Sequence, residues 1–198
     1  ARAARAALDA GDIARVLSLS ARGLRLSPRG RDRGVLLVLR AFGSMYADRA
    51  NDASFQEALA LIPEGTEFWW LAVSLAVWNA VTAGQSAQAA PYIARAIHAN
   101  MDAEPCGPQG QALCLSVIGL ISIKQVALAE ALIDRFERAA HAHRDACDPL
   151  FIGWLTLARS TPSSMRRTRH CWPIRLLSTW NSTSRPVSSR PTLSFQSV

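Results

Sequence analysis

Acidic side chains are missing from the last part of this chain, since all 15 Asp and Glu lie at or before Asp148. Residues 1–158 hold 14 Arg and one Lys against those 15 acids, so this part carries no net charge. The seven remaining Arg, from Arg159 to Arg190, account for the formal net charge of +7. Phosphate binding requires a clustered basic face, and neutrality therefore argues against nucleic-acid binding by residues 1–158.

Paired cysteine motifs are also missing. Cys106, Cys114, Cys147 and Cys171 show no CxxC pairing. Three of them fall in or beside apolar helical stretches, where a free thiol behaves as a small hydrophobe. We therefore expect a reducing compartment, the cytoplasm.

No apolar run has the length of a membrane-spanning helix. The longest, Phe68 to Ala83, is interrupted by Ser74 and Asn79 and is shorter than the roughly 20 residues that cross a bilayer. We predict a buried helix there and no membrane contact. Hydrophobic residues nevertheless make up 49% of the 198 residues, which is enough to bury a sizeable core.

Four segments repeat one pattern, in which a turn is followed by a helix with small and large apolar residues at spacings of four and three. Gly11, Gly84 and Lys124 open three of these segments, and a weaker copy contains Phe55 and ends at Pro63. From Gly11 to Gly84 is 73 residues, or two units, and from Gly84 to Lys124 is 40. A period in the mid-thirties to forty is typical of helical-hairpin repeats.

Between these segments the sequence predicts four partner helices, at about Asp32 to Ala47, Glu67 to Ala83, Gln109 to Ile123, and Pro149 to Ala158. The stretches FWWLAVSLAVW and LCLSVIGLISI are apolar on nearly every side, so neighbouring helices must cover both of their sides. We therefore predict an all-α fold of stacked antiparallel hairpins for residues 1–158. Because the first residues, ARAARAALD, read as the last turns of a helix already under way, we also expect that an upstream part is missing.

Residues 58–97, ALALIPEGTEFWWLAVSLAVWNAVTAGQSAQAAPYIARAI, resemble the tetratricopeptide-like region that follows the catalytic part of large bacterial signalling proteins. These proteins include eukaryotic-like serine/threonine kinases and signal-transducing ATPase regulators, of a kind common in high-GC bacteria such as myxobacteria. The 21 Arg against one Lys are compatible with a GC-rich source. The residues that carry the resemblance are Pro63, Gly65, Trp69, Trp70, Gly84, Ala89 and Ala96.

The resemblance extends over residues 1–158 and implies a right-handed tetratricopeptide-like solenoid with a regulatory, partner-binding role. Any kinase or ATPase activity would lie in the missing upstream part. Ser20 and Gly23 depart from the strict tetratricopeptide pattern and predict looser packing in the first repeat. We expect a non-catalytic scaffold, without a cofactor, whose concave face binds a protein or peptide.

Two short motifs suggest a catalytic or metal site but lack the necessary context. Residues 143–145, His-Arg-Asp, match the start of a protein-kinase catalytic loop, yet Leu150 stands where that loop needs a metal-binding Asn. His141, His143 and Cys147 could be read as metal ligands, but a second pair of ligands is missing. We predict neither a catalytic nor a metal site.

Tryptophans are the remaining candidates for a functional role. Trp69, Trp70, Trp78 and Trp154 fall at helical positions in apolar stretches, which favours packing in the core. The alternative is that one of Trp69 or Trp70 lies at the rim and contacts a partner. These two residues are therefore the candidate partner-binding residues.

Residues 159–198 form a separate tail with 15 Ser and Thr, seven Arg, four Pro and no acid. Helical periodicity stops at its start. One interpretation is a basic, disordered arm that binds nucleic acid or an acidic partner. The other is a stretch read in the wrong frame from GC-rich DNA, which the simultaneous loss of acids and helical period favours.

Overall fold

The computed structural model describes residues 1–26, 28–47, 54–99 and 104–167, with side chains up to Thr161. These residues form α-helices, one short 3-10 helix and no strand, which confirms the all-α prediction for the described part. The α-helices are α1 (Arg2–Asp9), α2 (Ile13–Arg25), α3 (Gly30–Tyr46), α4 (Ser54–Leu61), α5 (Glu67–Thr82), α6 (Ala90–His98), α7 (Gly107–Ser122), α8 (Val126–Ala142) and α9 (Pro149–Arg167). The 3-10 helix, Ser86–Ala89, precedes α6.

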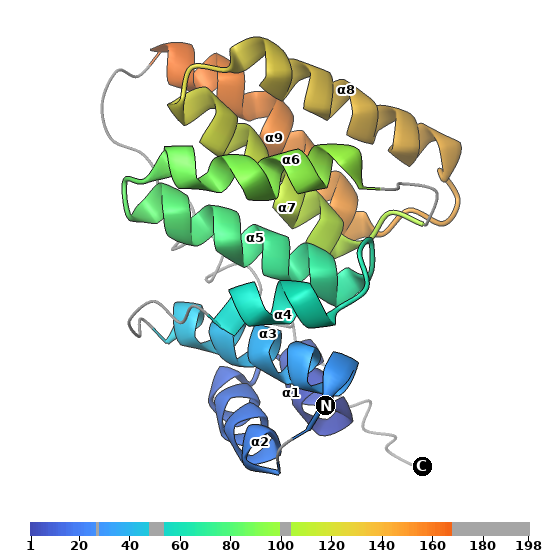
Figure 1. Ribbon diagram of the computed structural model, residues 1–198. Coiled ribbons are helices and arrows are strands. Elements are labelled where there is room, and N and C mark those ends of the chain that lie inside the picture. The colour runs from blue at the N-terminus through green and yellow to red at the C-terminus, as the bar shows by residue number, and fades with distance from the viewer. Residues whose placement is uncertain (27, 48–53, 100–103, 168–198) are drawn as a thin grey trace, which may run out of the picture. The chain divides into compact units, whose positions relative to one another are not determined.

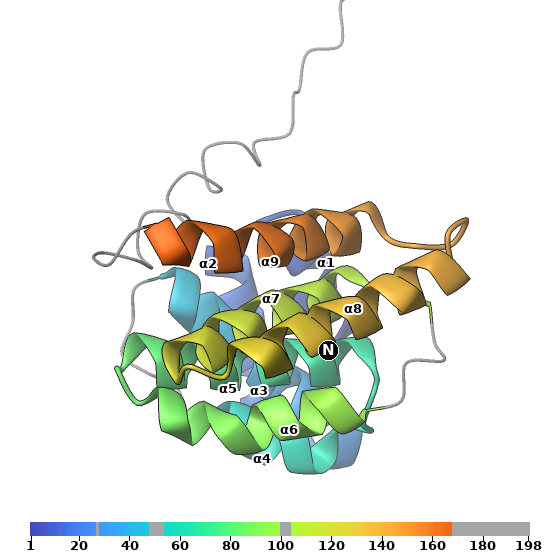
Figure 2. The same cartoon turned by 90° about the horizontal axis from the view of Figure 1, so that it is seen from above.

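Helices that follow one another in the sequence pack as pairs, and the pairs succeed one another through the described unit (Figure 1). Each odd-numbered helix also contacts the next odd-numbered helix, so α1, α3, α5, α7 and α9 form a continuous row of contacts. In Figure 2, α7 lies between α5 and α9. The two strongly apolar helices, α5 and α7, are therefore covered on both sides, as their sequences require.

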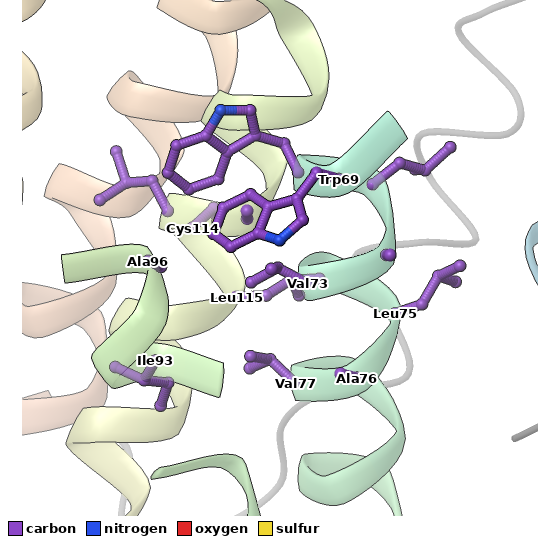
Figure 3. Packing of buried hydrophobic residues seen from close by; sticks show 14 of the residues in the cluster. Trp69, Val73, Leu75, Ala76, Val77, Ile93, Ala96, Cys114 and Leu115 are labelled. Atoms are coloured by element: carbon purple, nitrogen blue, oxygen red, sulfur yellow. The ribbon is translucent and has the colours of Figure 1, made fainter. Parts of the chain in front are cut away.

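The core around α5 illustrates this two-sided burial (Figure 3). Trp69, Val73 and Val77 project towards α6 and α7, whereas Leu75 projects from the opposite side of the helix. Trp69 is 0% exposed and Leu75 is 2% exposed, so both sides of α5 are dry. The side chains that meet α5 from α6 and α7 include Ile93, Ala96, Cys114 and Leu115.

The turns at Gly11, Gly84 and Lys124 share one backbone conformation. Their φ angles are 70°, 71° and 63°, in the left-handed region that ends many helices. In each turn the amide of the next residue donates a hydrogen bond to the carbonyl five residues before it. The pairs are Asp12 to Ala7 (2.9 Å), Gln85 to Ala80 (2.8 Å) and Gln125 to Leu120 (2.8 Å).

The first helix pair packs more closely than the sequence suggests. A Cβ atom built at Gly23 would lie 2.9 Å from Leu36 Cδ1, so α2 and the Leu36 side chain of α3 come close together at this position. Ser20 is 0% exposed, and its hydroxyl donates a hydrogen bond to the carbonyl of Val16 at 2.7 Å. The expectation of loose packing at these two positions is therefore wrong.

Helices α3, α5 and α7 agree with their predicted bounds to within two residues, but α9 does not end at Ala158 and continues to Arg167. The hydroxyls of Ser160 and Thr161 donate to the carbonyl of Leu157, at 2.8 and 2.9 Å, so these residues stay compatible with the helix. Arg159 pairs with Glu137 of α8 at 2.7 Å. The rest of the predicted disordered tail, from Thr168 on, lies outside the described residues.

Candidate functional site

Trp69 and Trp70 belong to an aromatic series that crosses the core. Their ring centroids lie 4.8 Å apart in an edge-on arrangement. Trp70 continues edge-on to Phe136 of α8 at 6.2 Å, and Phe136 stacks on Phe151 of α9 at 5.9 Å. Trp69 and Trp70 are 0% and 1% exposed. Neither indole is therefore available to a partner in this structure.

The ring of Trp69 also contacts a charged side chain, the guanidinium group of Arg95. The guanidinium carbon of Arg95 lies 5.3 Å from the centre of the Trp69 ring, within the range of a cation–π interaction. Arg95 also pairs with Glu64 at 3.6 Å. The indole N–H of Trp69 is buried and has no hydrogen-bond partner among the described residues. The Trp69 side chain therefore packs α5 against the neighbouring helices.

A different set of apolar side chains is partly open to solvent. Helices α3, α5 and α7 end at Tyr46, Thr82 and Ser122. Four residues before these ends, and again one residue before them, each helix carries a large apolar residue that is half-buried. We call this set the apolar ladder; it consists of Phe42, Met45, Trp78, Val81, Ile118 and Ile121.

The ladder spans three helices that touch in order, because α3 contacts α5 and α5 contacts α7. Residues three apart on a helix lie on one face, so each helix contributes one pair of neighbouring side chains. None of the six members carries a charge. At the α3 end, the ring of Tyr46 lies 4.7 Å from that of Phe42, and burial raises the pKa of the Tyr46 hydroxyl.

The kinase-like and metal-like motifs lie at the end of α8. Residues 143–146 form a turn, in which Asp145 is exposed. His141 is exposed on the last turn of α8, whereas Cys147 is half-buried beyond the turn. Within the described ranges no group of three His, Cys, Asp or Glu side chains is placed to hold a metal ion. The structure thus does not bring His141, His143 and Cys147 together as ligands.

The described cysteines form no disulfide, and their thiols are not activated as nucleophiles. Cys114 is buried in α7, and burial raises the pKa of its thiol to about 12. Burial also raises the pKa of Cys106, and burial together with the carboxylate of Asp148 raises that of Cys147. A thiol reacts as its thiolate, so none of the three is activated at neutral pH.

Asp148 has a structural role instead. Its Oδ2 atom accepts a hydrogen bond from the backbone amide of Gly107 at 2.8 Å. Its Oδ1 atom accepts another from the amide of Leu150, also at 2.8 Å. One carboxylate therefore ties the start of α7 to the start of α9.

The chain matches no family model, no curated protein and no solved structure. The tetratricopeptide-like relationship therefore stays a prediction based on residues 58–97. Among the helices that the structure describes, none combines the length and the apolar character needed to span a membrane.

Proposed function

We propose that this chain is a non-catalytic scaffold, a right-handed tetratricopeptide-like solenoid, which binds a protein or peptide on the face formed by its odd-numbered helices. The apolar ladder is the observation that carries this proposal. Single exposed apolar residues are common on any protein. In this proposal, large apolar residues that recur at one position in three adjacent helices form one surface, and an apolar surface patch of this kind is characteristic of a binding site.

The arrangement of the helices supports a repeat architecture. In a solenoid each repeat contacts only its neighbours, so odd-numbered helices should contact one another in order. The described helices follow this rule from α1 to α9. The shared turn at Gly11, Gly84 and Lys124 gives the hairpins α1/α2, α5/α6 and α7/α8 the same exit from their first helix. The free thiols of Cys106, Cys114 and Cys147 fit the cytoplasmic location included in this proposal.

The ladder favours an amphipathic helix as the ligand. Packed helices lie about 8–10 Å apart, so successive rungs have roughly this spacing. Two turns of an α-helix rise about 10.8 Å. A helix that crosses α3, α5 and α7 can therefore place one apolar side chain on each rung, with its polar face in solvent.

Replacing Trp78 and Ile118 together by serine is expected to weaken this interaction by roughly 30-fold or more, since a central apolar anchor contributes about 2 kcal/mol or more. The probes are amphipathic helical peptides selected by display on the wild-type chain, and their affinities are measured by fluorescence anisotropy. Both positions are half-buried, so circular dichroism of each variant establishes that it remains folded.

The matched control replaces two exposed apolar residues outside the ladder, Leu128 on α8 and Ile152 on α9, which are 41% and 43% exposed. This control should bind the selected peptides like the wild type. Equal loss of binding in both variants, or unchanged binding in the folded ladder variant, would show that the ladder is not the binding surface.

A further inference from the structure

We propose that the corner between α2 and α3 is a second docking surface, which binds an acidic segment of a protein partner. This basic corner consists of the side chains of Arg22, Arg25, Leu26, Arg29 and Arg31. All five are exposed, and Leu26, at 80%, is the most exposed of the large apolar side chains in the described part. The basic corner and the apolar ladder share no residue, so an experiment that disproves one binding surface leaves the other untouched.

The neutrality of residues 1–158 conceals a strong separation of charge. Residues 1–47 contain nine Arg and no Lys against three Asp and no Glu, which gives them a net charge of +6. Residues 48–158 carry the balancing charge of −6. The first helices are therefore basic, although residues 1–158 as a whole are neutral.

Two other arginines of these helices have carboxylate partners among the described residues, whereas the exposed Arg2 and Arg15 have none. Arg5 donates to Glu67 at 2.6 Å and to Asp9 at 2.8 Å. Arg33 donates to Glu57 at 2.6 Å, and this hydrogen bond lowers the pKa of the Glu57 carboxyl. By contrast, none of the four corner arginines forms an ion pair with any carboxylate of the described residues, Asp32 included. Their positive charges are thus available to an external anion.

Two of the four corner arginines stabilise the helix that carries them, whereas the other two do not. Arg22 and Arg25 lie in the last turn of α2, where the helix dipole favours a positive charge. Arg29 occupies the N-cap of α3 without a capping hydrogen bond from its side chain, and Arg31 lies in the first turn. A positive charge at a helix N-terminus is unfavourable, and Arg at the N-cap lacks the acceptor that Ser or Asp would supply. Such departures from local preference are typical of functional positions.

The composition of the corner indicates the chemistry of its partner. A guanidinium group forms paired hydrogen bonds with a carboxylate. Leu26 follows the two arginines of α2 along the chain and precedes Arg29 and Arg31 at the start of α3, and its exposed side chain offers an apolar contact between the two pairs in the sequence. A sugar-phosphate backbone is polar along its length and has no aliphatic side chain to pair with Leu26, and peripheral membrane helices bury a whole apolar face rather than one side chain. An acidic protein segment that contains an apolar residue can pair its carboxylates with the arginines and pack its apolar side chain against Leu26.

The test uses a protein of residues 1–198 and a fluorescein-labelled peptide in which two leucines are flanked by runs of glutamate. Binding is followed by fluorescence anisotropy at low and at physiological salt. The corner variant replaces Arg22, Arg25, Arg29 and Arg31 by Gln, and a separate variant carries Leu26→Ser. The matched control replaces four other exposed arginines by Gln, at Arg2, Arg15, Arg138 and Arg144, so its net charge equals that of the corner variant.

We expect the corner variant to bind the probe at least roughly tenfold more weakly than the wild type, and the control variant to bind within about twofold of it. Leu26→Ser should weaken binding several-fold without altering its salt dependence. Equal losses in the corner and control variants would overturn the proposal, because net charge alone would then explain binding. It would also be overturned if the wild-type chain ignored the peptide, or if the corner substitutions affected binding to duplex DNA or to phosphatidylserine vesicles but not to the peptide.

Discussion

Replacing Trp70 by alanine is expected to lower the free energy of unfolding by about 3–5 kcal/mol, the usual cost of removing a large buried aromatic side chain. Trp70 is 1% exposed and contacts the rings of both Trp69 and Phe136. It therefore joins α5 to α8, and its loss leaves a cavity between two hairpins that the helix backbones cannot close. The change is measured by guanidinium unfolding, followed by circular dichroism.

Trp78→Ala is the matched control for Trp70→Ala, because the same substitution is made on the same helix at a half-buried position. It should cost about 1 kcal/mol, since water already reaches part of this side chain. Similar losses in the two variants would contradict the assignment of Trp70 to the core and Trp78 to the apolar ladder.

Gly110→Ala on α7 is expected to destabilise the chain by about 1–3 kcal/mol. A Cβ atom at this position would lie 3.0 Å from Phe151 Cα and 3.1 Å from the carbonyl oxygen of Phe151. Both atoms belong to the backbone of α9, so no side-chain rotation can relieve the contact, and α7 and α9 must move apart. The effect is measured by thermal and guanidinium unfolding.

Gly153→Ala provides the control for this substitution. Gly153 lies within α9, and a Cβ atom there would meet no other atom within 4 Å. Alanine is a better helix former than glycine, so this variant should be more stable by about 0.5–1 kcal/mol. Opposite signs at Gly110 and Gly153 are the expected pattern. A stabilising effect at both positions would mean that α7 and α9 do not pack closely at Gly110.

The sequence predicts the helices well because their ends are encoded locally. Gly11, Gly84 and Lys124 occupy the left-handed position that ends one helix and directs the chain into the next. The end of α9 escapes prediction, because Ser160 and Thr161 are typical of loops. They stay helical by returning their hydroxyl hydrogen bonds to Leu157, and this depends on a helix that already exists.

The binding surfaces are harder to predict than the helices. In α5, large apolar residues occur on every side, so periodicity does not reveal whether Trp69, Trp70 or Trp78 faces solvent. Only the neighbouring helices decide this, and they leave Trp78 partly open. An alignment of the helix ends would have revealed Phe42, Trp78 and Ile118 as equivalent positions. The basic corner is visible in the sequence only when the net charge is summed over residues 1–47, because residues 48–158 balance it within the neutral residues 1–158.

The apolar ladder requires that α3, α5 and α7 lie side by side in register, so that their half-buried side chains form one surface. Spin labels on Thr82→Cys and Ser122→Cys test this directly, because both positions are exposed and end adjacent helices. Cys106, Cys147 and Cys171 are first replaced by serine, while Cys114, which is 1% exposed, is left in place.

Pulsed electron paramagnetic resonance on this doubly labelled chain should give a single narrow distance distribution between about 10 and 20 Å, as expected for labels on helices about 8–10 Å apart. A distribution centred beyond about 30 Å would place the ends of α5 and α7 apart, and neither the stacked hairpins nor the apolar ladder could then exist.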